Sequence, residues 1–120
     1  MKTIIHEFSG RQIAEIQSDG IIIRKWRDII DIISQMLSRK VDALILHEKN
    51  LAPEFFQLKT GIAGEILQKL ANSKIKVAFV GDFDSYKSKS LKAFIAESNL
   101  GNQVNFSADL QSAISSIGSE

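Results

Sequence analysis

The stretches VDALIL (residues 41–46) and IKVAFV (residues 75–80) are nearly continuous apolar runs of strand length. Such a run is typical of a strand that is buried on both faces, whereas a strand with one solvent-exposed face alternates between apolar and polar residues. Both runs are therefore predicted to be central strands of a parallel sheet.

The segments around these two strands have the spacing of amphipathic helices. Apolar residues recur every three or four positions before the first run, which predicts a helix through Trp26, Ile29, Ile30, Ile33, Met36 and Leu37. A second helix is predicted over residues 62–70. Pro53 favours a short helical turn over residues 53–56, because its missing N–H would be unpaired in a first turn anyway.

The N-terminal residues predict an opening β-hairpin. Residues 4–8 and 13–16 are short and rich in β-branched side chains, and Ser9-Gly10-Arg11 between them offers a turn. His6 lies in this predicted edge strand, where we expect a structural role.

The last third of the chain is predicted to add a helix, a strand and another helix. Ser88 or Ser90 can cap a helix that ends near Gly101. Residues 104–106 then have the character of a strand, and Ser107 is the expected N-cap of a final helix.

These elements predict one α/β domain over residues 1–120, with the order ββαβαβαβα. A chain of 120 residues builds one hydrophobic core. Strands that alternate with helices imply right-handed crossovers, and hence a mostly parallel sheet with an antiparallel edge hairpin and packed helices.

The composition narrows the range of partners. A net charge of +1, from 15 Lys and Arg against 14 Asp and Glu, creates no field that would attract nucleic acid or an acidic membrane. The chain has no Cys and no apolar run near the roughly 20 residues that span a bilayer. We expect a cytoplasmic domain that binds neither nucleic acid nor a membrane and needs no cofactor.

A binding site is expected where the carboxyl ends of the parallel strands meet, because loops and helix N-termini converge there. Two polar loops qualify, one running from residue 47 to the helix start at 60–64 and one over residues 81–90. The candidate binding residues on them are Asn50, Phe55, Phe56, Lys59, Thr60, Gly61, Gly64, Asp82, Tyr86, Lys87 and Ser88.

Two features single out the first loop. Thr60 precedes Gly61 and Gly64 at a helix start, where a hydroxyl can cap the backbone and glycines allow another backbone or a phosphate to come close. The same residues would also serve simple capping and tight helix packing. Phe55 and Phe56 cannot both point inward from one short helical turn, so one of them should line a pocket or an interface.

The polar side chains at this edge leave two chemical readings open. His47 and Glu48 could form a base and its helper, or with Asp82 and Asp84 an oxygen-and-nitrogen metal site. The His-Glu pair is not followed by the second histidine of a zinc-protease helix. No metal site and no catalytic residue is therefore predicted.

A distinctive pattern is formed by Asn50-Leu51, by residues 55–65, by Gly81-Asp82-Phe83 and by residues 86–91. In this pattern the chain resembles a bacterial family, the domain-of-unknown-function family 4180. The resemblance covers nearly the whole chain. It identifies relatives and implies no mechanism.

The predicted element order also resembles that of STAS domains, the sulfate-transporter and anti-sigma-factor-antagonist modules. In that family a serine at a helix start is phosphorylated by a partner kinase, and about two added negative charges break a protein complex. The Asp-Ser-Ser-Gly motif falls on Leu58-Lys59-Thr60-Gly61, so Lys59 stands at the usual phosphorylated position and Leu58 replaces the acidic residue.

The leading hypothesis is a non-enzymatic regulatory or signalling module that binds a protein partner through residues 55–64 and the neighbouring loop 82–90. The alternative is a small-ligand-binding protein or enzyme that uses the polar loops at the carboxyl ends of the strands. A third possibility is a homodimer formed through the hairpin edge or the exposed aromatic residues.

Overall fold

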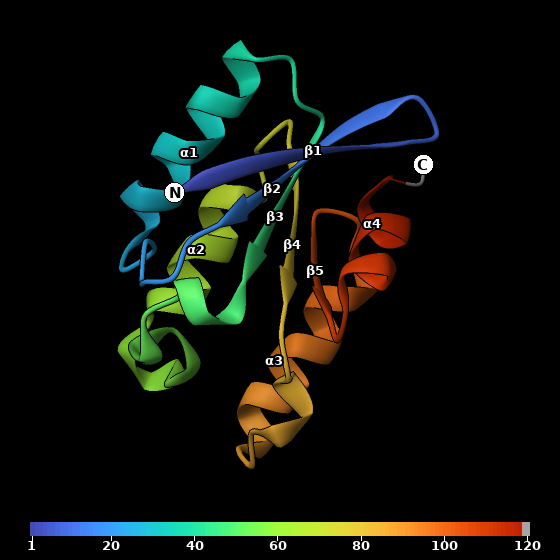
Figure 1. Cartoon of the computed structure of the whole chain (residues 1–120). Coiled ribbons are helices and arrows are strands. Elements are labelled where there is room, and N and C mark those ends of the chain that lie inside the picture. The colour runs from blue at the N-terminus through green and yellow to red at the C-terminus, as the bar shows by residue number, and fades with distance from the viewer. Residues whose placement is uncertain (119–120) are drawn as a thin grey trace.

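The computed structural model describes residues 1–118 as a five-stranded sheet in the order β1-β2-β3-β4-β5 with four α-helices (Figure 1). The strands are β1 (Lys2–Phe8), β2 (Arg11–Gln17), β3 (Ala43–His47), β4 (Lys76–Val80) and β5 (Val104–Ser107). The helices are α1 (Trp26–Ser38), α2 (Ile62–Leu70), α3 (Lys89–Leu100) and α4 (Leu110–Gly118). The predicted order ββαβαβαβα is confirmed. The last two residues of the expected domain lie outside the described range.

The opening hairpin has the predicted antiparallel pairing, and β2 to β5 are parallel to one another. Its turn consists of two residues, Ser9 with φ 53° and Gly10 with φ 79°. Positive φ at both central positions is what the two-residue hairpin turn needs, because it matches the twist of the strands. Arg11, expected in the turn, already begins β2.

The two faces of the sheet are covered unequally. The larger core cluster lies on one face, where buried side chains of α1 and α2 and half-buried side chains of α3 pack against Ala14, Leu44, Val77 and their neighbours. On the other face α4 packs alone, with Ala113, Ile114 and Ile117 buried against Ile13, Ile45, Ala78 and Val80. This explains why the central strands are apolar on both faces.

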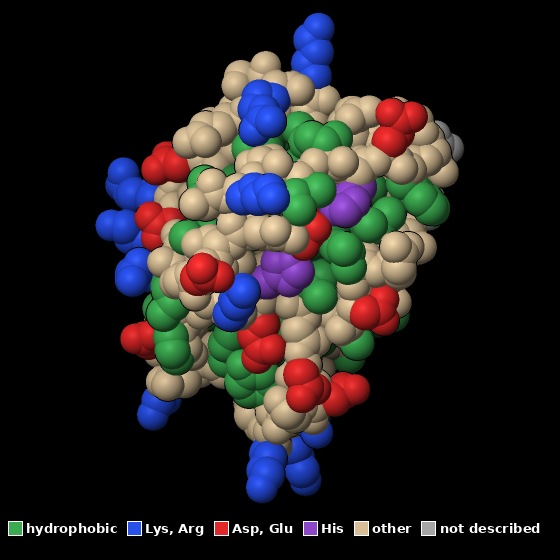
Figure 2. Space-filling model, in the orientation of Figure 1, with side chains coloured by type: hydrophobic (Ala, Val, Ile, Leu, Met, Phe, Trp, Pro, Cys, Tyr) green, Lys and Arg blue, Asp and Glu red, His purple; other side chains and the backbone are tan. Residues whose placement is uncertain are grey.

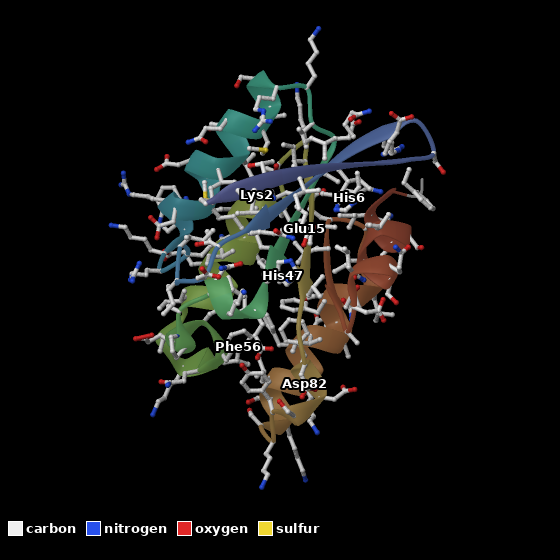
Figure 3. All side chains as sticks on the ribbon, in the orientation of Figure 1. Lys2, His6, Glu15, His47, Phe56 and Asp82 are labelled. Atoms are coloured by element: carbon white, nitrogen blue, oxygen red, sulfur yellow. The ribbon has the colours of Figure 1, made fainter. Side chains whose placement is uncertain are left out.

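The face that carries α4 stays partly open near the hairpin. Alternation along each strand places His6 of β1, Glu15 of β2 and His47 of β3 on that face. Figures 2 and 3 show both histidines at the surface, with the Glu15 side chain between them. A nine-residue helix covers only the part of the sheet next to it, so polar side chains occupy the rest.

The predicted N-cap of the final helix is wrong. Ser107 does not cap the final helix, because pairing with Val80 keeps it in β5. Asp109 takes that role, and its carboxylate accepts the Ser112 N–H at 2.8 Å. Trp26 is half-buried at the start of α1, where it packs against the larger core cluster and the Lys69 ammonium lies 4.4 Å from its ring centroid.

The two adjacent phenylalanines point in different directions, as predicted. Phe55 is 1 % exposed and lies 5.7 Å and 6.3 Å, between ring centroids, from Phe79 and Phe106. Phe56 is half-buried and stacks on Tyr86 at 4.7 Å. Phe56 is therefore the member of the pair that belongs to the surface.

Replacing these two residues should lower the free energy of unfolding by unequal amounts. Phe55→Ala leaves a cavity in the core and should lower the free energy of unfolding by about 3–5 kcal/mol. Phe56→Ala removes a ring that is still partly in water and should cost clearly less. Urea unfolding curves of the two variants measure the difference, and equal costs would contradict this packing.

Candidate ligand-binding site

A buried carboxylate stands at the centre of the open face. The Glu15 side chain is only 4 % exposed. Glu15 pairs with Ile45 of β3, two residues before His47, and His6 of β1 pairs with Ile13, two residues before Glu15. Both histidines are thus diagonal neighbours of Glu15 on one face, a separation that long side chains can bridge.

Both imidazoles are hydrogen-bonded to this carboxylate. His6 Nε2 lies 2.9 Å from Glu15 Oε1, and His47 Nε2 lies 2.7 Å from Glu15 Oε2. An ionised carboxylate only accepts hydrogen bonds, so each Nε2 is the donor. In each ring Nδ1 is the nitrogen turned away from Glu15.

Glu15 is ionised at neutral pH despite its burial. Desolvation by burial raises the pKa of the carboxyl group, but hydrogen bonds from His6, His47 and Gln17, together with the charge of His47, outweigh it and lower the pKa below its ordinary value. Glu15 therefore carries a negative charge inside the protein, and its three hydrogen-bond donors stabilise that charge.

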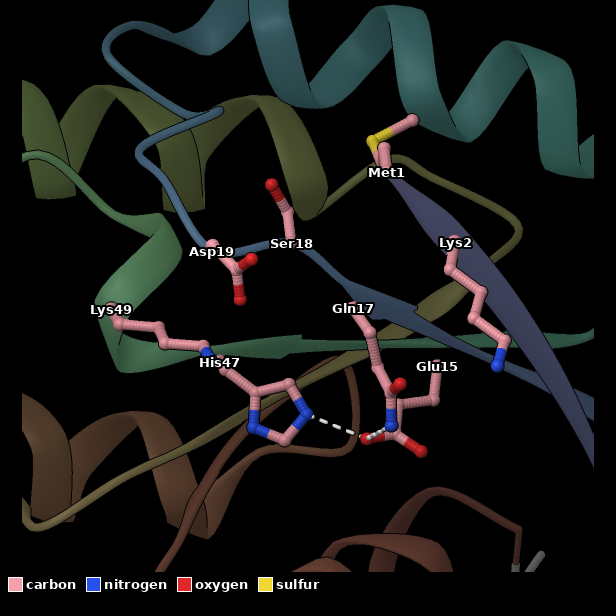
Figure 4. A pocket seen from close by; sticks show the side chains of 8 residues that line it. All are labelled: Met1, Lys2, Glu15, Gln17, Ser18, Asp19, His47 and Lys49. Carbon is pink, nitrogen blue, oxygen red and sulfur yellow. Dashed lines mark hydrogen bonds and ion pairs between the residues drawn. The ribbon is translucent and has the colours of Figure 1, made fainter.

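A pocket of about 570 Å³ opens beside this cluster, at the carboxyl ends of β2 and β3 (Figure 4). Its lining residues are Met1, Lys2, Glu15, Gln17, Ser18, Asp19, His47 and Lys49. The side chains are mostly polar, and they combine two ammonium groups with two carboxylates and an imidazole. Such a hollow suits a small polar ligand better than an apolar one.

The predicted loops after β3 and β4 come together next to this pocket. The Tyr86 hydroxyl donates to Glu48 Oε2 at 2.5 Å, and Glu48 Oε1 accepts the Asp82 N–H at 3.0 Å. Burial, the Glu48 hydrogen bond and the charge of Asp82 raise the pKa of Tyr86, so it stays a neutral donor. Glu48 is thus a bridge between the two loops.

Gly81 makes this bridge possible. A Cβ atom at position 81 would lie 2.5 Å from Glu48 Cβ, closer than such atoms approach in proteins. The predicted pair of His47 and Glu48 does not form, because the His47 ring is bonded to Glu15 and both Glu48 oxygens are occupied. Within residues 1–118, no three His, Asp or Glu side chains are arranged to hold a metal ion.

The helix start that was predicted as a binding surface is exposed. The Thr60 hydroxyl donates to two carbonyls of the preceding helical turns at 2.8 Å and accepts the Ile62 N–H at 3.3 Å. Gly61 has φ 78°, in the left-handed region. A Cβ atom on Gly64 would meet nothing within 4 Å, so tight helix packing does not explain this glycine. Lys59 is exposed beside them.

The remaining predicted site residues have structural partners or face the solvent. Asn50 is fully buried, and its side-chain amide donates to the Ser18 and Gly20 carbonyls at 2.8 Å and 2.9 Å. It therefore holds the loop after β2, which carries part of the pocket. Ser88 caps α3 by accepting the Leu91 N–H, and Lys87 is exposed.

Sequence reasoning missed Glu15 and, with it, the pocket residues Lys2, Gln17 and Asp19. One signal was available. Glu15 interrupts an apolar stretch on a predicted strand and shares a face with the fully buried Ile13. A carboxylate at such a position needs donors from neighbouring strands.

The comparisons with known proteins place the chain in a family. Residues 8–117 match the family described as "Domain of unknown function (DUF4180)", and the chain belongs to it. Glu15 and His47 lie inside the matched range, and His6 lies before it. No curated protein and no solved structure matches the chain. Within the described residues, no helix has the length and apolar character to cross a membrane.

Removing the charge of Glu15 should destabilise the protein in a pH-dependent way. Hydrogen bonds to a charged group contribute about 1.5–3 kcal/mol each, so Glu15→Gln should cost roughly 2 kcal/mol or more at pH 7. Because the folded-state pKa of Glu15 is lowered, this contribution is present above the unfolded pKa and is lost as the pH falls through the folded one.

The measurement is urea unfolding of both proteins from pH 7 down to pH 3. The difference in the free energy of unfolding between wild type and Glu15→Gln should become smaller in acid. Glu7→Gln, on the exposed side of β1, is the control and should show no such difference. A constant difference for Glu15→Gln would contradict an ionised Glu15.

Proposed function

We propose that this chain is a small-ligand-binding domain whose site is the pocket at the carboxyl ends of β2 and β3. One observation carries the proposal: the pocket contains an ionised, nearly buried carboxylate that is hydrogen-bonded to two histidines from neighbouring strands. This proposal takes up the alternative hypothesis from the sequence, a ligand site built from polar loops at this edge of the sheet. Glu15, and not Glu48, is the carboxylate that pairs with His47 in it.

Stability alone is a poor reason for such a cluster. Moving a carboxylate out of water costs several kcal/mol, and apolar residues of similar size often stabilise a protein at least as well as a buried ion pair does. The neighbouring strand positions on this face, Ile13 and Ile45, show that the sheet accepts apolar residues there. The charged arrangement is therefore better explained by an interaction with a ligand.

The cluster gives the pocket a defined hydrogen-bonding group. The bond to Glu15 fixes the orientation of the His47 ring and places its proton on Nε2, so Nδ1 is left to contact a ligand. His47 is about a quarter exposed, which leaves it accessible. The geometry defines no reaction by itself, and the proposal is confined to binding.

A ligand of this pocket should stabilise the protein. A compound at 100 times its Kd raises the free energy of unfolding by about 2.7 kcal/mol. At roughly 4 °C per kcal/mol for a chain of this size, the Tm rises by about 10 °C. A thermal-shift screen of charged and neutral polar metabolites measures this, with His47→Asn and Lys49→Gln run beside the wild type.

The variants decide whether a stabilising compound binds in this pocket. Its effect should shrink in His47→Asn and Lys49→Gln and stay unchanged in Lys59→Gln, whose exposed lysine lies outside the pocket. The proposal fails if no compound raises the Tm, or if the shifts are the same in all four proteins.

A second candidate function is a regulatory module that binds a protein partner through the start of α2. It is favoured by the exposure of Lys59, Thr60, Gly61 and Gly64 and by the open space over Gly64. The resemblance of the element order to STAS domains supports the same function. A homodimer through the hairpin edge and a cytoplasmic location also stay predictions.

A bulky residue at position 64 should block such a partner without harming the fold. Gly64→Trp places an indole in open space on a helix, where glycine is itself a poor helix former. A protein captured from cell lysate by the wild type should be lost with Gly64→Trp and kept with Ala96→Trp, an exposed control on α3. Equal capture by both variants would exclude this surface.

A further inference from the structure

An apolar groove adjoins the polar pocket at the same edge of the sheet. The groove has a volume of about 350 Å³, and its walls include Ile21, Pro53 and the stacked rings of Phe56 and Tyr86. Ile21 is 36 % exposed, so part of its apolar side chain faces the solvent in this groove. Apolar surface arranged in this way gains stability when a ligand covers it.

Lys49 connects the two hollows, because it lines both of them. It belongs to the short helical turn Glu48–Asn50 that follows β3, and its side chain forms part of the pocket wall in Figure 4. A ligand that occupies the pocket can therefore extend past Lys49 into the groove.

The pocket offers two ammonium groups to an anion. Glu15 already receives hydrogen bonds from His6, His47 and Gln17. Lys2 and Lys49 balance the charges of Glu15 and Asp19, and the Glu15 carboxylate is only 4 % exposed, so the two ammonium groups are what an anionic head group would contact.

The groove contains a carboxylate, Glu48, and both of its oxygens already have hydrogen-bond donors. One oxygen accepts the Tyr86 hydroxyl and the other accepts the Asp82 N–H. An acidic head group near Lys2 and Lys49 and an apolar tail beside Phe56 would thus each meet complementary surface.

We propose that the ligand is an amphipathic organic anion, with its carboxylate or phosphate head in the pocket and its apolar tail in the groove beyond Lys49. This inference rests on the proposed binding function and names the class of ligand. The aromatic surface that the sequence predicted at Phe56 and Tyr86 then belongs to the same site as Glu15 and His47.

The probes for this proposal are acetate, octanoate, octyl phosphate and 1-octanol, with Kd values from chemical-shift titrations of the full chain. Each buried methylene strengthens binding about fourfold, so octanoate should bind at least about tenfold more tightly than acetate even if only part of its tail is covered. 1-Octanol has the tail without the charge and should bind more weakly than octanoate.

Two kinds of variant separate head from tail. Lys2→Gln should weaken acetate and octanoate by the same factor, because both have the carboxylate. Ile21→Ser should weaken octanoate about tenfold and leave acetate unchanged. Leu37→Ser is the matched control, since Leu37 is 44 % exposed on α1 and lines neither hollow.

The outcomes are distinct. Octyl phosphate binding more tightly than octanoate supports a phosphate head, and the reverse supports a carboxylate. If octanoate binds no better than acetate, or if Ile21→Ser behaves like Leu37→Ser, the tail does not lie in the groove and the proposal is wrong. If 1-octanol binds as tightly as octanoate, the anionic head is wrong.

Failure of this proposal and failure of the proposed function can be told apart. If none of the four probes binds but another compound raises the Tm in a manner that depends on His47 and Lys49, the ligand class is wrong and the binding function stands. If no compound does so, both are wrong.

Discussion

The hydrogen bonds that join Glu15 to His6 and His47 are the interaction on which the candidate site depends. Three helices cover one face of the sheet and α4 alone covers the other, so the strand positions beyond α4 cannot all be apolar. A carboxylate that is 4 % exposed is tolerable there only because donors from both neighbouring strands reach it. The same bonds fix the His47 ring at the edge of the pocket.

Two glutamates organise this end of the sheet in different ways. Glu15 orders the polar pocket across three strands, whereas Glu48 ties the loop after β3 to the loop after β4 through Tyr86 and the Asp82 backbone. Lys49, which follows Glu48 in sequence, borders both the pocket and the apolar groove. The site is therefore built from segments that converge at the carboxyl ends of parallel strands, the usual place for a ligand in this class of fold.

The sequence was sufficient for the fold and insufficient for the site, for physical reasons. The strands predicted at 41–46 and 75–80 are encoded locally, in apolar runs of strand length that are rich in β-branched residues, and the structure has them at Ala43–His47 and Lys76–Val80. The role of Glu15 depends instead on strand register and on which face α4 covers, and both are long-range properties. Asn50 shows the same limit in reverse, because it was predicted to be a binding residue on a polar loop, but its side chain is buried and holds the loop after β2.

The most direct test of the central claim is an NMR measurement of the imidazole N–H protons of the two histidines in the folded protein. The account predicts two Nε2–H protons, shifted downfield and protected from exchange with water by the bonds to Glu15, and the loss of at least one of these signals in Glu15→Gln, where an amide NH2 group replaces one of the two acceptor oxygens. Rings whose protons exchange freely in the wild type, or spectra that do not change in Glu15→Gln, would contradict it.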